Sequence, residues 1–66
     1  MNIRINGEHR TIAAGLTITQ LLVAHKIAPA TIVVELNEVI IQPDLYTSIP
    51  LAEGDRLEFI RFVGGG

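Results

Sequence analysis

Polar and apolar side chains alternate over residues 2–6, at the start of the chain. A period of two is typical of a β-strand with one buried face, here the face of Ile3 and Ile5. The dipeptide Asn6-Gly7 follows directly, and it accepts the two positive φ angles of a type I′ turn. The pattern therefore predicts an N-terminal β-hairpin whose return strand covers residues 8–13.

A single helical segment is predicted next, over residues 17–26. Thr17 and Gln20 have the spacing of a capping box, in which each side chain bonds the backbone N–H of the other. Lys26 falls in the expected last turn, where a cation suits the helix dipole, and Pro29 prevents further helix. The face expected to lie on the sheet combines Ile18, Leu21, Leu22 and His25.

Three more strands complete the pattern. Residues 31–36 are rich in β-branched side chains, and residues 39–41 follow a turn at Asn37-Glu38. Residues 43–48 are expected to be irregular with one helical turn, and residues 56–63 form the last strand. The order of two strands, a helix, two strands and one strand predicts an α+β fold: a mixed sheet of about five strands with one main helix across one face.

The last strand predicts an apolar patch on the uncovered face of this sheet. If Leu57 and Phe59 point toward the helix, then Ile60 and Phe62 point away from it, and Val33 can join them. Scattered surface hydrophobes are common, whereas a contiguous exposed patch marks a binding site. Both interpretations stay open at this point. The candidate partner-binding residues are Ile60, Phe62 and Val63.

The composition excludes several classes of function. A chain of 66 residues is one domain at most, and we expect a folded domain over residues 1–63 and a flexible tail over residues 64–66. There is no Cys, so a disulfide, a thiol nucleophile and a cysteine zinc site are all excluded. The net charge is −2 and the five basic residues are scattered, which is unlike a nucleic-acid-binding surface.

Neither a catalytic residue nor a metal site is predicted. His9 and His25 are the only histidines, and neither has a second ligand at metal spacing. No nucleophile is accompanied by a base and an orienting group, so the chain is not expected to be an enzyme. No apolar run approaches the roughly 20 residues of a membrane span, and the first residues do not resemble a signal peptide. A cytoplasmic location is expected.

The tail, Gly64-Gly65-Gly66, carries the strongest chemical signal. Glycines lack Cβ and can thread a narrow channel. A linker or a frayed end is the plain alternative. A terminal carboxylate on Gly66 is ionised at neutral pH and can attack the α-phosphate of ATP. The chain has no G-x-x-x-x-G-K-[ST] loop, so ATP and Mg²⁺ would be used by a separate activating enzyme and no cofactor would be bound here.

Three segments resemble a known family, the thiamine-biosynthesis sulfur carriers (ThiS), which have the ubiquitin-like β-grasp fold. They are Val34-Glu35-Leu36-Asn37, residues 51–58, and Phe62-Val63-Gly64-Gly65-Gly66. The resemblance covers essentially the whole chain. One departure is Glu38, because the family often has Gly after the Asn of this turn.

The resemblance implies a mechanism and a set of partners. An E1-like adenylyltransferase (ThiF) would adenylate Gly66, and a persulfide sulfur, usually from a cysteine desulfurase, would displace AMP to leave a C-terminal thiocarboxylate. Thiazole synthase (ThiG) would accept the sulfur into the thiazole ring of thiamine. Three alternatives are the small subunit of molybdopterin synthase, a ubiquitin-like protein modifier, and a plain binding module with an accidental tail.

Overall fold

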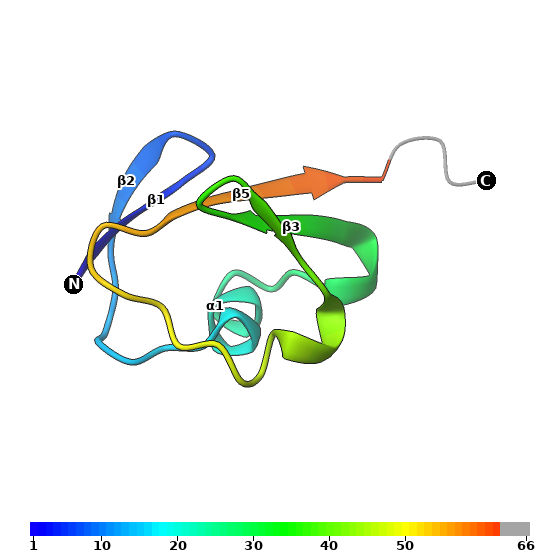
Figure 1. Ribbon diagram of the computed structural model, residues 1–66, viewed down its shortest axis with the longest axis horizontal. Coiled ribbons are helices and arrows are strands. Elements are labelled where there is room, and N and C mark those ends of the chain that lie inside the picture. The colour runs from blue at the N-terminus through cyan, green and yellow to red at the C-terminus, as the bar shows by residue number, and fades with distance from the viewer. Residues whose placement is uncertain (63–66) are drawn as a thin grey trace.

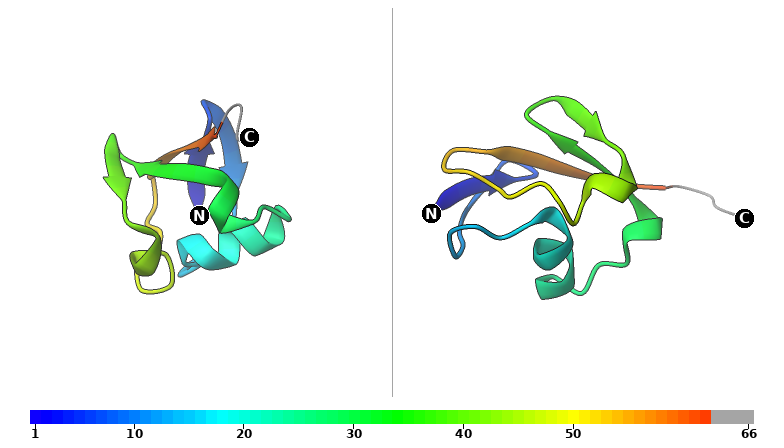
Figure 2. Two further views of the ribbon diagram at one scale, coloured as in Figure 1. Left: turned by 90° about the vertical axis from the view of Figure 1, so that its right-hand side faces the viewer. Right: turned by 60° about the horizontal axis from the view of Figure 1, so that its bottom comes forward.

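The protein is described from a computed structural model, and the structure describes residues 1–62. Its five strands form one sheet in the order β2-β1-β5-β3-β4, in which only β1 and β5 run parallel. The helix α1 lies across one face of this sheet (Figures 1 and 2). This arrangement confirms the predicted α+β fold. The elements are β1 (Asn2–Ile5), β2 (Glu8–Thr11), α1 (Ile18–Ala24), η1 (Pro29–Thr31), β3 (Ile32–Leu36), β4 (Val39–Ile41), η2 (Pro43–Leu45) and β5 (Arg56–Arg61).

Both two-residue hairpin turns have the positive φ angles of a type I′ turn. Asn6 and Gly7 have φ of 51° and 81°, which confirms the turn predicted between β1 and β2. Asn37 and Glu38, between β3 and β4, have φ of 52° and 70°. Glu38 therefore occupies a backbone conformation that favours glycine, the residue expected there from the family resemblance.

The start of α1 is the predicted capping box. The Thr17 side-chain oxygen accepts a hydrogen bond from the Gln20 backbone N–H at 3.2 Å, and the Thr17 backbone N–H donates to Oε1 of Gln20 at 2.9 Å. The helix then places Ile18, Leu21 and Leu22 on the sheet, as predicted.

The end of α1 differs from the prediction. The helix ends at Ala24, and Lys26 has a φ of 58° instead of lying in the last helical turn. The Lys26 N–H donates to the Val23 carbonyl at 3.0 Å and the Ile27 N–H donates to the Leu22 carbonyl at 2.9 Å, the pattern of a Schellman motif. Ile27 packs against the core, a hydrophobic contact that often accompanies this motif. The side chain of His25 is exposed, so the expected place of His25 on the buried face was wrong.

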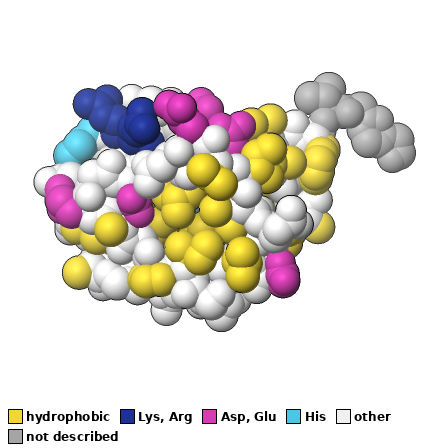
Figure 3. All heavy atoms as spheres, in the orientation of Figure 1, with side chains coloured by type: hydrophobic (Ala, Val, Ile, Leu, Met, Phe, Trp, Pro, Cys, Tyr) yellow, Lys and Arg dark blue, Asp and Glu magenta, His cyan; other side chains and the backbone are white. Residues whose placement is uncertain are grey.

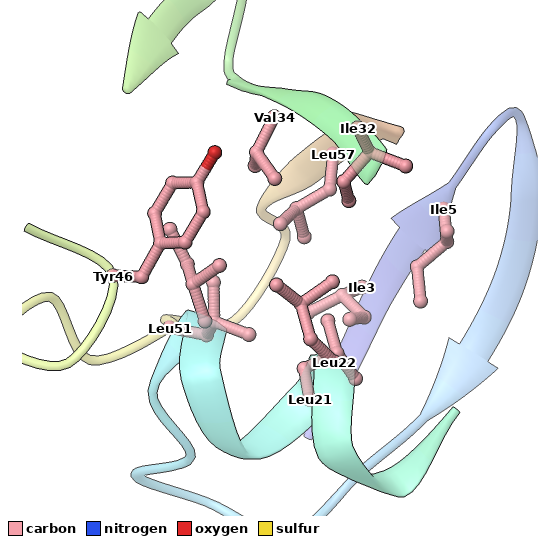
Figure 4. Packing of buried hydrophobic residues seen from close by; sticks show 10 residues of the cluster. Ile3, Ile5, Leu21, Leu22, Ile32, Val34, Tyr46, Leu51 and Leu57 are labelled. Carbon is pink, nitrogen blue, oxygen red and sulfur yellow. The ribbon is translucent and has the colours of Figure 1, made fainter. Parts of the chain in front are cut away.

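The core lies between α1 and the sheet. Figure 4 shows Leu21 and Leu22 of α1 pointing toward Ile3, Ile32 and Leu57 of the strands. Tyr46 and Leu51 close one side of this cluster from the segment between β4 and β5. Val34 and Leu57 lie on the helix side of their strands and are at most 1% exposed. Their neighbours along each strand therefore face away from the helix.

Candidate functional site

The central strand β5 leads the chain toward its C-terminal residues. It pairs with β1 on one side and with β3 on the other. The side chains of two turn asparagines add to these pairings: Oδ1 of Asn6 accepts from the Phe59 N–H and Oδ1 of Asn37 accepts from the Arg56 N–H, both at 2.9 Å. The Phe62 N–H donates to the Thr31 carbonyl at 3.2 Å. Hydrogen bonds from three separate segments thus fix the path of the chain as far as residue 62.

The structure confirms the predicted orientation of Ile60 and Phe62. Leu57 is buried and Phe59 is half-buried on the helix side, whereas Ile60 is 45% exposed and Phe62 is 62% exposed. Val33 lies directly opposite Ile60 in the β3–β5 register, so it also belongs to the uncovered face. The role of this face in partner binding stays a prediction.

Ile40 is an apolar residue of this face that the sequence reasoning missed. It lies opposite Glu35 across β3 and β4, and it is 61% exposed. Because Val34 points into the core, its neighbour Glu35 faces away from the helix, and Ile40 faces the same way. The signal that could have found it is the register set by the two-residue turn at Asn37-Glu38.

The other end of the uncovered face is charged. A shallow cavity of about 280 Å³ is lined there by two arginines and three glutamates. Nη1 of Arg56 lies 3.7 Å from Oε2 of Glu38, and both side chains are largely exposed. The charged lining residues are Arg4, Glu35, Glu38, Arg56 and Glu58. This end of the uncovered face therefore presents both positive and negative charge.

The histidines make no metal centre in the described structure. Nε2 of His9 lies 3.1 Å from Oδ1 of Asn2, and the side chain of His25 is exposed. Residues 1–62 contain no group of three His, Cys, Asp or Glu side chains placed to hold a metal ion. Within the same residues, no helix has the length and apolar character needed to cross a membrane.

Val63 and Gly64-Gly65-Gly66 lie outside the described residues. The assignments of Val63 to the docking face, of Gly64 and Gly65 to a tail, and of Gly66 to the reacting group therefore stay predictions. The structure does describe β5, the strand that precedes these residues in the sequence.

Comparison with known proteins identifies the family. The ThiS family profile matches residues 3–66. The chain is 36% identical over 50 residues, 76% of each protein, to the sulfur carrier protein ThiS of Bacillus subtilis. It is 36% identical over its whole length to a thiazole synthase of Magnetococcus marinus, but it spans only 20% of that protein. A thiazole synthase of Paramagnetospirillum magneticum is 35% identical, with the same share of its length covered.

A solved structure extends the likeness to three dimensions. The crystal structure of the thiamine biosynthesis protein ThiS from Geobacter metallireducens superposes with a TM-score of 0.87, at 38% identity and with both chains fully covered. Family and fold agree, and the chain belongs to the ThiS family, with the ubiquitin-like β-grasp fold.

Proposed function

We propose that this chain is the sulfur carrier of thiamine biosynthesis and that its Gly66 carboxylate holds the sulfur. The observation that supports this most directly is the extent of the family match, which runs through all three glycines to residue 66. The names of the relatives favour this role over a molybdopterin synthase subunit or a protein modifier.

The proposed chemistry proceeds in three steps. A carboxylate oxygen of Gly66 attacks the α-phosphorus of ATP, pyrophosphate leaves, and an acyl-adenylate forms. The terminal sulfur of a persulfide then attacks the acyl carbon and AMP leaves. A second thiol attacks the donor sulfur of the resulting acyl disulfide, forms a new disulfide with the donor and releases the thiocarboxylate, which is a stronger nucleophile than the carboxylate it replaces.

Partner enzymes supply the catalytic groups in this scheme. An E1-like adenylyltransferase similar to ThiF binds ATP and Mg²⁺, a cysteine desulfurase or another donor supplies the persulfide, and a thiazole synthase similar to ThiG accepts the sulfur. The carrier itself is a protein substrate, not an enzyme, and needs no bound cofactor. The proposal includes a cytoplasmic location for the carrier. Two relatives named thiazole synthase contain a segment similar to this whole chain, which supports the acceptor assignment.

The apolar part of the uncovered sheet face is the proposed docking surface for these enzymes. A partner that receives Gly66 in its active site must also contact the end of β5, from which the last residues continue. Ile60 and Phe62 are exposed at that end, and Val63 is the next residue. Aliphatic and aromatic anchors of this kind usually dominate the affinity of protein interfaces.

Intact-mass spectrometry tests the proposal. The first measurement is the mass of the protein purified from its own host, because only a chain ending at Gly66 presents that carboxylate. Incubation with the E1-like enzyme, ATP and a persulfide donor should then replace one oxygen by one sulfur. Omission of ATP is the control. Attachment of the chain to lysines of other proteins would support a modifier instead, and a mass unchanged under all conditions would overturn the proposal.

A further inference from the structure

The uncovered face of the sheet arranges its side chains in bands along β5. Every second residue of this strand faces away from the helix, so the order toward the C-terminus is Arg56, Glu58 and Ile60, followed by the exposed Phe62 just beyond the strand. Successive members of this series lie about 7 Å apart, since a strand rises about 3.4 Å per residue. Figure 3 shows the same order along its upper rim: basic, then acidic, then hydrophobic side chains.

Residues of the neighbouring strands β1 and β3 add side chains of the same kind beside those of β5. Arg4 of β1 lies opposite Arg56, and Val33 of β3 lies opposite Ile60. Glu35 lies directly opposite Glu58 in the register of β3 and β5. Two like charges thus face each other across adjacent strands, an arrangement that lowers stability.

Within residues 1–62 neither Glu35 nor Glu58 forms an ion pair, although Arg4 and Arg56 line the same cavity as both carboxylates. The only two ion pairs in this part of the chain are Arg10–Glu8 and Arg56–Glu38. Arg56, the closest cation along β5, is thus directed to the turn. Arg4 lines the cavity from β1, the neighbouring strand on one side of β5. On other sides of the acidic pair, Ile40 lies beyond Glu35 and Ile60 lies two residues beyond Glu58. The fold therefore keeps two adjacent carboxylates beside the exposed apolar residues, and neither takes part in an ion pair within residues 1–62.

We infer that the thiazole synthase places an arginine across Glu35 and Glu58 when its apolar surface covers Ile60 and Phe62. This inference rests on the proposed function. A planar guanidinium has five N–H donors and can bond two carboxylates at once, which the point charge of a lysine does less well. The apolar contacts supply affinity. The acidic pair determines which partner binds and in which orientation, because a partner bound in another position would desolvate both carboxylates without supplying a cation. Thiazole synthase is the chosen partner because two relatives of that name contain a matching segment.

The test measures binding of the purified thiazole synthase from the same organism by isothermal titration, at low and high salt. The double variant Glu35→Gln/Glu58→Gln should bind at least about tenfold more weakly at low salt, or about 1.4 kcal/mol. Its affinity should also depend less on salt than that of the wild type, because a charge pair has been removed. Asp44→Asn in η2 is the control for a general loss of negative charge: it removes one charge, against two in the double variant, outside the open face and should leave binding unchanged.

A second readout separates binding from folding. The double variant should unfold at a higher urea concentration than the wild type, because the repulsion across β3 and β5 is gone. Weaker binding by a more stable protein is the expected signature. Affinity equal to that of the wild type, or a loss no greater than for Asp44→Asn, would overturn the inference.

The remaining outcomes separate this inference from the proposed function. If the wild type binds the thiazole synthase and the double variant binds it equally well, only the inference fails. If the double variant loses affinity for the E1-like enzyme alone, the arginine is not on the acceptor and the inference is wrong as stated. If the wild type does not bind the thiazole synthase at all, the acceptor assignment of the proposed function fails as well.

Discussion

Oδ1 of Asn6 accepts a hydrogen bond from the backbone N–H of Phe59 at 2.9 Å, across 53 positions of the chain. Asn6 is also the first central residue of the β1–β2 turn, with a φ of 51°. Asn37 repeats the arrangement from the β3–β4 turn by accepting from the Arg56 N–H. Each hairpin turn therefore serves as a clamp on β5, the strand that leads to the C-terminal residues.

Replacing Asn6 should separate the two contributions of this residue. Asn6→Ala loses the hydrogen bond and strains the left-handed backbone, so the free energy of unfolding should fall by about 2 kcal/mol. Asn6→Gly keeps the turn and loses only the hydrogen bond, so about 1 kcal/mol is expected. Asn6→Asp retains an acceptor oxygen and should stay close to the wild type. Urea unfolding measures all three, and equal stability of the Ala variant and the wild type would contradict the clamp.

Leu21 should contribute a large part of the stability, because its side chain is only 1% exposed in the core. Leu21→Ala should lower the free energy of unfolding by about 2–5 kcal/mol through lost burial and the cavity left behind. Val23 is two residues away on the same helix and is 71% exposed, so Val23→Ala is a matched control with an expected change within about 0.5 kcal/mol. Similar denaturation midpoints for the two variants would contradict the observed burial.

Local sequence signals were enough to predict the parts of the fold that local chemistry decides. Asn6-Gly7 specifies its turn and Thr17 with Gln20 specifies the start of α1. The end of α1 was not predictable, because the left-handed residue after a helix is usually Gly and here it is Lys26. Ile27 decides this end by packing against the core, a tertiary contact that the helical spacing does not reveal.

Some residues of the candidate site could likewise be predicted from local sequence patterns, and others could not. Alternation along β5 predicted the exposure of Ile60 and Phe62, because the strand is long enough for its buried face to be recognised. Strand β4 has three residues, all apolar, so its own pattern does not say which face Ile40 occupies. Likewise, the pairing of Glu35 with Glu58 depends on the register between β3 and β5, which are separated by 19 residues of chain.

Glu38 should be replaceable by Gly with a gain in stability. Its φ of 70° is unfavourable for a side chain with a Cβ, and Glu38→Gly removes this strain, so the free energy of unfolding should rise by up to about 1 kcal/mol. The ion pair lost with it is long and exposed, and such pairs contribute little. Glu38→Ala loses the same ion pair but keeps the strain, so it should show no gain. A gain for Ala equal to that for Gly would place the effect in the ion pair.

Deleting Gly65-Gly66 should abolish activation without affecting folding. The core cluster is drawn from residues between Ile3 and Leu57, so urea unfolding of the truncated protein should match that of the wild type. ATP-dependent adenylation by the E1-like enzyme, followed as pyrophosphate exchange, should disappear. Undiminished exchange would show that Gly66 is not the reacting residue, and loss of cooperative unfolding would show that the tail takes part in the fold.

Phe62→Asp should weaken binding to both the activating enzyme and the thiazole synthase while leaving the free domain folded. Phe62 is 62% exposed, so an aspartate there stays in water in the isolated protein. In a complex that covers the end of β5, the same carboxylate would be desolvated without a partner. If Phe62 is an anchor of the interface, the loss in binding free energy should exceed about 2 kcal/mol for each enzyme.

Val23→Asp provides the control for this substitution, because it introduces the same charge at another exposed apolar position, on α1 and away from the open face. Isothermal titration measures both variants, and circular dichroism checks that each is folded. Unchanged affinity of Phe62→Asp for both enzymes would show that Ile60 and Phe62 are scattered surface hydrophobes and not a binding site. If the docking face lies at the end of β5, only the substitution at Phe62 should weaken binding. Equal losses of affinity for the two variants would instead show that the added negative charge causes the effect.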